Sequence, residues 1–227
     1  MPYRHLSAAG LRALLRGASA LMLCLGLALE PAPAITFDPA HLVAYASRHY
    51  GAGAGRAVQA WQDMLRQAAG RSEQEKLRMV NQFWDQALME SEDITVWGRV
   101  DYWATPLESL AKGAGDCEDY VIGKYFSLLY LGVAPEKLRL VYVRARVGGQ
   151  NIAHMVLGYY PQPMAEPLVL DSLVDRIQPA HLRPDLTPVF SFNAEGIYIP
   201  GGKQSSVDRI GRWRDLLSKM QAEGFQP

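Results

Sequence analysis

Residues 117–131 constrain the fold most, because they form an apolar stretch long enough for a buried helix. The largest apolar residues in it are Val121, Ile122, Tyr125, Phe126, Leu128 and Leu129. At helical spacing these side chains lie around much of the circumference, and a helix without a broad polar face must be buried. The fold therefore has to cover this segment with other elements on several sides.

Further helices are predicted before this segment. They span residues 39–50, 56–69, 73–88 and 106–112. Asp38 and Pro39 supply an N-cap and a first-turn proline for the first of them. Ser72 and Thr105 are each followed three residues later by a glutamate, which is the capping-box pattern that opens a helix. The first half of the exported chain is therefore predicted to be helical.

The second half contains strand-like segments. They lie at 138–147, 152–160, 168–173, 189–192 and 196–199, and they are rich in Val, Leu, Ile, Tyr or Phe. Gly148 and Gly149 favour a hairpin between the first two, and an amphipathic helix over 207–222 closes the chain. Helices followed by consecutive strands indicate an α+β fold, with an antiparallel sheet packed on the central helix.

The N-terminus has the pattern of a secretory signal peptide. Three arginines precede the uncharged run 18–29, and Ala-Pro-Ala at 32–34 offers the small residues that a signal peptidase requires. The run is shorter than the roughly 20 residues of a membrane-spanning helix, so we expect release and not anchoring. We predict a signal peptide at 1–34 and one domain at 35–227.

Composition favours neither a nucleic acid nor an anionic membrane as partner. The chain has 23 basic and 23 acidic residues, so it carries no excess of positive charge. A lipid anchor on Cys24 is a weaker interpretation of the N-terminus, because such anchors usually follow a small residue and Leu23 is large.

Cys117 is the cysteine that remains once the signal peptide, with Cys24, is removed. It begins the predicted buried helix, where unpaired N–H groups and the helix dipole favour a thiolate. His154 and Asp171 follow on neighbouring predicted strands, so the three can supply a nucleophile, a base and an orienting carboxylate. The alternatives are an inert buried cysteine and a structural His154. The other histidines of the exported chain are interpreted as structural or solvent-exposed: His41, His49 and His181.

Three carboxylates surround this cysteine, namely Asp116, Glu118 and Asp119. Nearby negative charge raises the pKa of a thiol, so something must offset it. One interpretation is that acids in the first turn complement the helix dipole, with Asp116 as the N-cap. The other is that the three bind a hard cation such as Ca²⁺. The residues alone leave both interpretations open.

Four further motifs stand out along the chain: Asp-Tyr-Trp-Ala-Thr-Pro-Leu-Glu at 101–108, Gly-Asp-Cys-Glu-Asp at 115–119, Ala-His-Met-Val-Leu at 153–157 and Glu-Pro-Leu-Val-Leu-Asp at 166–171. Together they resemble the bacterial transglutaminase-like cysteine proteinases, and within them the LapG-like periplasmic adhesin proteases. The resemblance implies a papain/transglutaminase-like fold and a Cys-His-Asp triad of Cys117, His154 and Asp171. It also implies that Asp116, Glu118 and Asp119 are Ca²⁺ ligands.

The same resemblance implies a periplasmic enzyme that cleaves the N-terminal region of a large surface adhesin at a pair of alanines. It implies further that cleavage releases the adhesin and disperses biofilm, and that an inner-membrane receptor for cyclic di-GMP holds the protease inactive. Two other functions remain open, namely transglutaminase-type acyl transfer and a non-catalytic sequestering or adaptor role. The backbone N–H of Cys117 is a natural oxyanion donor. An indole of Trp97 or Trp103 could be the second, although core packing also explains both.

Overall fold

The computed structural model describes residues 35–199 and 206–226. The predicted signal peptide, with Cys24, lies outside the described residues. Within them, no helix is both long and apolar enough to cross a membrane. Thr36 and Gln226 form an antiparallel bridge, so the two ends of the described chain lie together.

The N-terminal half is helical, as predicted. Its helices are α1 (Pro39–Tyr50), α2 (Ala52–Ala68), α3 (Glu73–Ala87), α4 (Asp93–Trp97) and α5 (Pro106–Lys112). Asp38 caps α1, and the capping boxes at Ser72 and Thr105 are both formed. The short α4 was not predicted, and neither was the parallel pairing of β1 (Met89–Glu90) with β2 (Ala114–Gly115).

The C-terminal half forms a six-stranded antiparallel sheet with the order β6–β5–β4–β3–β7–β8. The strands are β3 (Leu138–Val147), β4 (Gln150–Tyr159), β5 (Leu168–Leu170), β6 (Gln178–Pro179), β7 (Leu186–Asn193) and β8 (Gly196–Tyr198). The predicted third strand ended at 173, but β5 ends at Leu170, so Asp171 follows the strand and does not lie on it. The predicted α+β class with an antiparallel sheet is confirmed.

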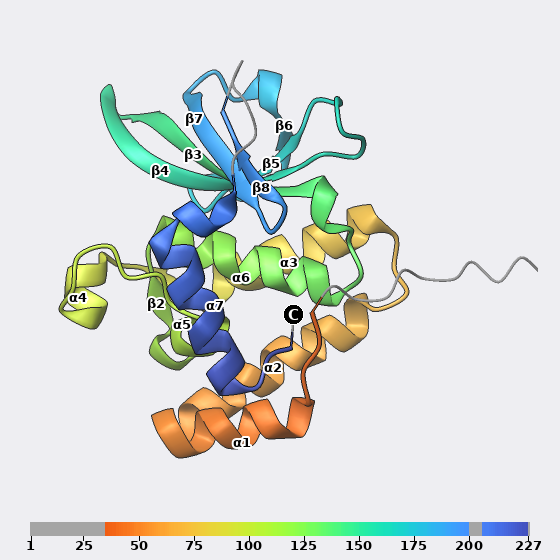
Figure 1. Cartoon of the computed structure of the whole chain (residues 1–227), viewed down its shortest axis with the longest axis vertical. Helices are drawn as coiled ribbons and strands as arrows, with labels where there is room; N and C mark the ends of the chain where they lie inside the picture. Colours follow the sequence, from red (N-terminus) through yellow and green to blue (C-terminus); the bar gives the residue numbers. More distant parts are fainter. Residues whose placement is uncertain (1–34, 200–205, 227) are drawn as a thin grey trace, which may run out of the picture.

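The apolar helix α6 (Cys117–Tyr130) lies between the sheet and the other helices, as Figure 1 shows. Ser127 fixes it in the helical layer, because its Oγ accepts hydrogen bonds from the indoles of Trp61 on α2 and Trp84 on α3, both at 2.9 Å. The same hydroxyl donates to the carbonyl of Gly123 at 2.7 Å. Three helices therefore meet at one oxygen atom.

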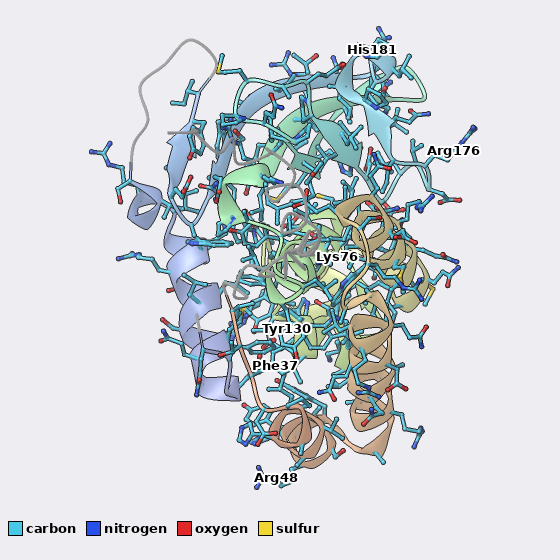
Figure 2. All side chains as sticks on the ribbon, turned by 90° about the vertical axis from the view of Figure 1, so that its right-hand side faces the viewer. Phe37, Arg48, Lys76, Tyr130, Arg176 and His181 are labelled. Carbon is cyan, nitrogen blue, oxygen red and sulfur yellow. The ribbon has the colours of Figure 1, made fainter. Side chains whose placement is uncertain are left out.

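The ends of the chain complete the core. The predicted helix 207–222 is instead a 3₁₀ turn (Val207–Arg209) followed by α7 (Gly211–Glu223), because glycine favours a helix end over a helix interior. At the other end, Phe37 stacks on Tyr130 of α6 with ring centroids 4.3 Å apart, and Figure 2 shows the two side chains next to each other.

Candidate active site

The thiol of Cys117 lies between the start of α6 and strand β4. Cys117 is the first residue of α6, and its Sγ lies 3.1 Å from Oε2 of Glu118. The backbone of Met155, the residue after His154, acts on the sulfur as well, and it lowers the pKa of the thiol. Burial, followed by the charge of Glu118, raises the pKa of the thiol. The structure thus places Cys117 beside the segment of β4 that carries His154.

His154 and Asp171 are directly hydrogen-bonded, with 2.7 Å between Nε2 and Oδ1, and both are buried. The pairing of β4 with β5 brings them together, since Leu157 lies opposite Leu170. Burial alone would raise the pKa of Asp171, but hydrogen bonds from His154, the N–H of Leu173 and Arg183 lower it. An ionised Asp171 can only accept, so it fixes the proton on Nε2 and leaves Nδ1 as the basic ring nitrogen.

Arg183 is a member of this site that the sequence did not reveal. Its side chain is 4% exposed, and its Nη2 donates to Oδ2 of Asp171 at 2.6 Å. It also binds Asp185 through Nη2 at 2.8 Å and Nε at 3.1 Å. Arg183 therefore neutralises the carboxylate that holds His154. It lies in an irregular loop, where no periodicity predicts the direction of a side chain.

A cluster of three acids lies behind the cysteine. Asp93, Asp116 and Asp119 each place one carboxylate oxygen within 4.8 Å of the others. Within the described residues, Asp93 Oδ1, Asp116 Oδ1 and Asp119 Oδ2 are buried and have no hydrogen-bond partner. The remaining oxygens of Asp93 and Asp119 accept from the backbone N–H groups of Tyr102 and Ala104. Asp93 was not predicted, and β1–β2 pairing brings the chain just before it alongside the strand that leads to Asp116.

Glu118 occupies a different position from the other two predicted ligands. Its carboxylate lies with Asp116 and Cys117 in a second group of atoms within 4.8 Å of one another. The N-cap interpretation of Asp116 is wrong in one respect, because the residue occupies the N-cap position but its side chain makes no capping hydrogen bond. The oxygen of Asp116 is therefore available for another partner.

The electrostatics of the cluster favour a cation. Burial, followed by repulsion from the neighbouring carboxylates, raises the pKa of Asp116 to about 10. Burial raises the pKa of Asp93 to about 6, and it raises that of Asp119 well above its usual range. Buried carboxylate oxygens without partners are costly unless they are neutralised, and several of them in one place suit a hard divalent cation. The residues present thus fit Ca²⁺.

The two tryptophans considered as oxyanion donors are both packed. Trp103 is buried and stacks on Phe192 with ring centroids 5.8 Å apart, whereas Trp97 packs on Tyr102 at 4.8 Å. Both indole N–H groups lack a hydrogen-bond partner within the described residues. Core packing is confirmed for Trp103, and an oxyanion role for either indole stays a prediction.

Comparison with known proteins decides the family. The model of the bacterial transglutaminase-like cysteine proteinases matches residues 34–181. The chain belongs to this family. No curated protein sequence matches it.

Solved structures of a relative extend this result to most of the chain. This transglutaminase-like proteinase is similar to EGTA-treated LapG of Legionella pneumophila, with 35% identity over 82% of this chain and 100% of that one, and a TM-score of 0.73. It is also similar to calcium-bound LapG of the same organism, with 36% identity over 81% of this chain and 99% of that one, and a TM-score of 0.70. The protein is therefore a LapG-like cysteine proteinase.

Proposed function

We propose that this LapG-like proteinase is a calcium-dependent periplasmic endopeptidase that cleaves the N-terminal region of a large surface adhesin between two alanines. Cleavage releases the adhesin and promotes biofilm dispersal, and the periplasmic domain of an inner-membrane cyclic-di-GMP receptor inhibits it. The observation that carries the proposal is the buried His154–Asp171 pair beside a cysteine at a helix N-terminus, in a chain of this family.

The geometry supports nucleophilic catalysis by Cys117. His154 Nδ1 takes the thiol proton, and the sulfur attacks the substrate carbonyl to form a tetrahedral intermediate. The backbone N–H of Cys117 donates to the oxyanion. The imidazolium then protonates the leaving amine, and His154 next activates the water that hydrolyses the thioester. Asp171, held by Arg183, keeps the imidazole in the required tautomer and orientation.

The acidic cluster supports the calcium dependence. Asp93, Asp116 and Asp119 would hold the ion through their unpaired oxygens, with Glu118 on the thiol side of the site. The bound charge would neutralise the cluster and fix the turn that leads into Cys117. The similarity to a calcium-bound LapG structure is consistent with this assignment.

The decisive experiment uses the protein over residues 35–227 and an N-terminal adhesin fragment from the same bacterium. We expect a single cut between adjacent alanines, which mass spectrometry locates, and we expect EGTA or Cys117→Ala to prevent it. An added primary amine distinguishes the acyl-transfer alternative, because transfer would leave the fragment intact with the amine attached to a glutamine. Absence of both products with calcium-loaded protein would refute the proposal.

A further inference from the structure

Strand β4 extends well beyond its neighbour on one side. It pairs with β3 over its whole length, from Gln150 to Tyr159, but it pairs with β5 only at Leu157–Tyr159. In Figure 1 the outer parts of β3 and β4 reach the upper left of the molecule, whereas β5 and β6 lie to the right. The outer part of β4 therefore has a strand on one side only.

The hydrogen-bond pattern identifies the residues that face this open side. Arg146 N–H bonds to Asp185 on the β7 side, so the even-numbered residues of β3 face β7 and the odd-numbered ones face β4. The β4 residues opposite these odd-numbered positions are Ile152 and His154, which consequently face β3. Asn151, Ala153 and Met155 must then direct their N–H and C=O groups to the open side.

The surroundings of the cysteine agree with this orientation. Cys117 begins α6, which packs on β4, and the backbone of Met155 lowers the pKa of its thiol, as an N–H directed from the open side towards the sulfur would. No backbone group of the described residues pairs with Asn151 or Ala153 on that side. Ala153 precedes Met155 by two residues, or about 7 Å along the strand. A peptide paired with Ala153 thus reaches the sulfur two residues further along.

The side chains beside this edge are basic. Arg144 lies opposite Ala153, and Arg146 lies opposite Asn151. Both arginines are exposed, and neither forms an ion pair with a described residue. Cross-strand partners share a face of the sheet, and on this face lies a groove of about 510 Å³. Its lining includes Tyr142, Arg144, Asn151, Ala153, Val189 and Phe190.

Arg144 is within reach of a peptide on the open edge. Such a peptide would lie two strand spacings from β3, or about 10 Å, which an arginine and an acidic side chain span together. Ala153 lies between Arg144 and the open edge, and its small methyl group does not block the arginine from reaching across β4. Unpaired arginines favour carboxylate partners.

We propose that residues 150–155 of β4 are the docking strand for an extended, acidic segment of the peptide substrate. The peptide adds to the open edge as a further strand, as in β-augmentation, and Arg144 binds an aspartate or glutamate two residues from the scissile carbonyl. This inference rests on the proposed endopeptidase function.

The first test measures side-chain preference. Calcium-loaded protein is incubated with peptides randomised around a central Ala-Ala, and cut sites are read by mass spectrometry. We expect about tenfold enrichment of Asp and Glu at a position two residues from the cut, as one charge-assisted hydrogen bond would give. Arg144→Gln should abolish this enrichment. Arg48→Gln is the matched control, because Arg48 is exposed on α1 at the opposite end of the molecule (Figure 2) and should leave the enrichment unchanged.

The second test measures backbone pairing. Peptides of the preferred sequence are N-methylated at one residue at a time, which removes single N–H donors. We expect methylation two residues from the cut to raise KM about tenfold, and Ala153→Pro, which removes an N–H from the open edge only, to do the same. Iodoacetamide labelling of Cys117 should proceed at the wild-type rate in Arg144→Gln and Ala153→Pro.

These results separate the two proposals. Cleavage without acidic enrichment, or with no position sensitive to methylation, would overturn the docking strand and leave the endopeptidase intact. Absence of any cleavage of the library and of the adhesin fragment would instead refute the proposed function.

Discussion

Arg183 and His154 bind opposite oxygens of the same carboxylate. Arg183 Nη2 lies 2.6 Å from Oδ2 of Asp171, and His154 Nε2 lies 2.7 Å from Oδ1. The arginine is as buried as the histidine, so its charge acts on Asp171 with little screening from solvent. Arg183 therefore holds in place the carboxylate that orients His154 in the proposed triad.

Loss of this arginine should impair catalysis more than binding. In Arg183→Gln the pKa of Asp171 should rise, because a buried cation that stabilises the carboxylate is removed. We expect kcat to fall about tenfold or more, KM to change little, and the acidic limb of the pH–rate profile to move to higher pH. Asp185→Asn is the control, since it removes the negative charge of the other partner of Arg183 and leaves the Asp171 contact in place. An unchanged kcat in a folded Arg183→Gln protein would contradict this role.

The proposed triad predicts a graded series of losses. Cys117→Ala should abolish cleavage of the adhesin fragment, and His154→Ala should be nearly as severe because it removes the base and the proton donor together. Asp171→Asn should retain more activity, since packing still orients part of the imidazole population. Circular dichroism should show an intact fold in each variant. Residual cleavage by Cys117→Ala would exclude this cysteine as the nucleophile.

Calcium should stabilise the protein through Asp93 as well as through the predicted acids. A ligand that binds only the native state at 100 times its Kd adds about 2.7 kcal/mol to the free energy of unfolding. We expect Ca²⁺ to raise Tm and Mg²⁺ to do so poorly, because Mg²⁺ requires a tighter octahedral shell. Calorimetry and thermal scans on EGTA-stripped protein measure both effects.

Asp93→Asn separates a lost ligand from a damaged fold. Removal of one buried negative charge should raise the Tm of the stripped protein, while the gain on adding Ca²⁺ should shrink. Asp63→Asn is the matched control, because Asp63 lies on the surface of α2 and pairs with Arg66. Equal calcium affinity in wild type and Asp93→Asn would show that Asp93 is not a calcium ligand.

Gly123 should tolerate no side chain. A Cβ at this position of α6 would lie 2.5 Å from the ring atoms of Trp84, so the helices would have to separate. Gly123→Ala should therefore lower the free energy of unfolding by about 1–3 kcal/mol, as overpacked cores do. At Gly53 in α2 the nearest atom lies 4.0 Å away, so Gly53→Ala should be neutral or stabilising. Urea denaturation of both variants measures the difference.

Glu223 should make stability depend on pH. Burial, followed by the charge of Glu108, raises the pKa of Glu223 to about 8, although it accepts a hydrogen bond from Thr105. An unfolded glutamate titrates near 4.3. The native state therefore holds a proton that the unfolded state loses, and the resulting stability is complete below about pH 4 and lost as the pH rises through about 8. Glu223→Gln should flatten this part of the Tm–pH curve, and a parallel curve would disprove the assignment.

Local signals predicted the helices and the fold class well. The caps at Asp38, Ser72 and Thr105 form as expected, because each depends on residues within three positions. The short α4 and the β1–β2 pair were missed, since segments of this length show no periodicity. Strand β5 was predicted to be too long, because its apolar sequence does not show where its pairing with β4 ends.

The residues of the candidate site were also predicted only in part. The order of His154 and Asp171 along the chain predicted that they meet, and the structure joins them, although Asp171 directly follows β5 and does not lie on it. Asp93 and Arg183 could not be found, because one reaches the cluster through long-range pairing and the other through the direction of a loop side chain. The open edge of β4 likewise depends on where a different strand ends.

The shared hydroxyl of Ser127 has a consequence for the placement of the nucleophile. Two indoles and a carbonyl of α6 itself saturate this oxygen, so α6 cannot slide or turn without breaking the two hydrogen bonds that join it to α2 and α3. A shift of one residue would displace the helix start by about 1.5 Å and rotate it by about 100°. Displacements near 1 Å can cost a reaction about a hundredfold in rate. The position of the Cys117 sulfur thus depends partly on contacts in the middle of α6, far from any atom that touches the substrate.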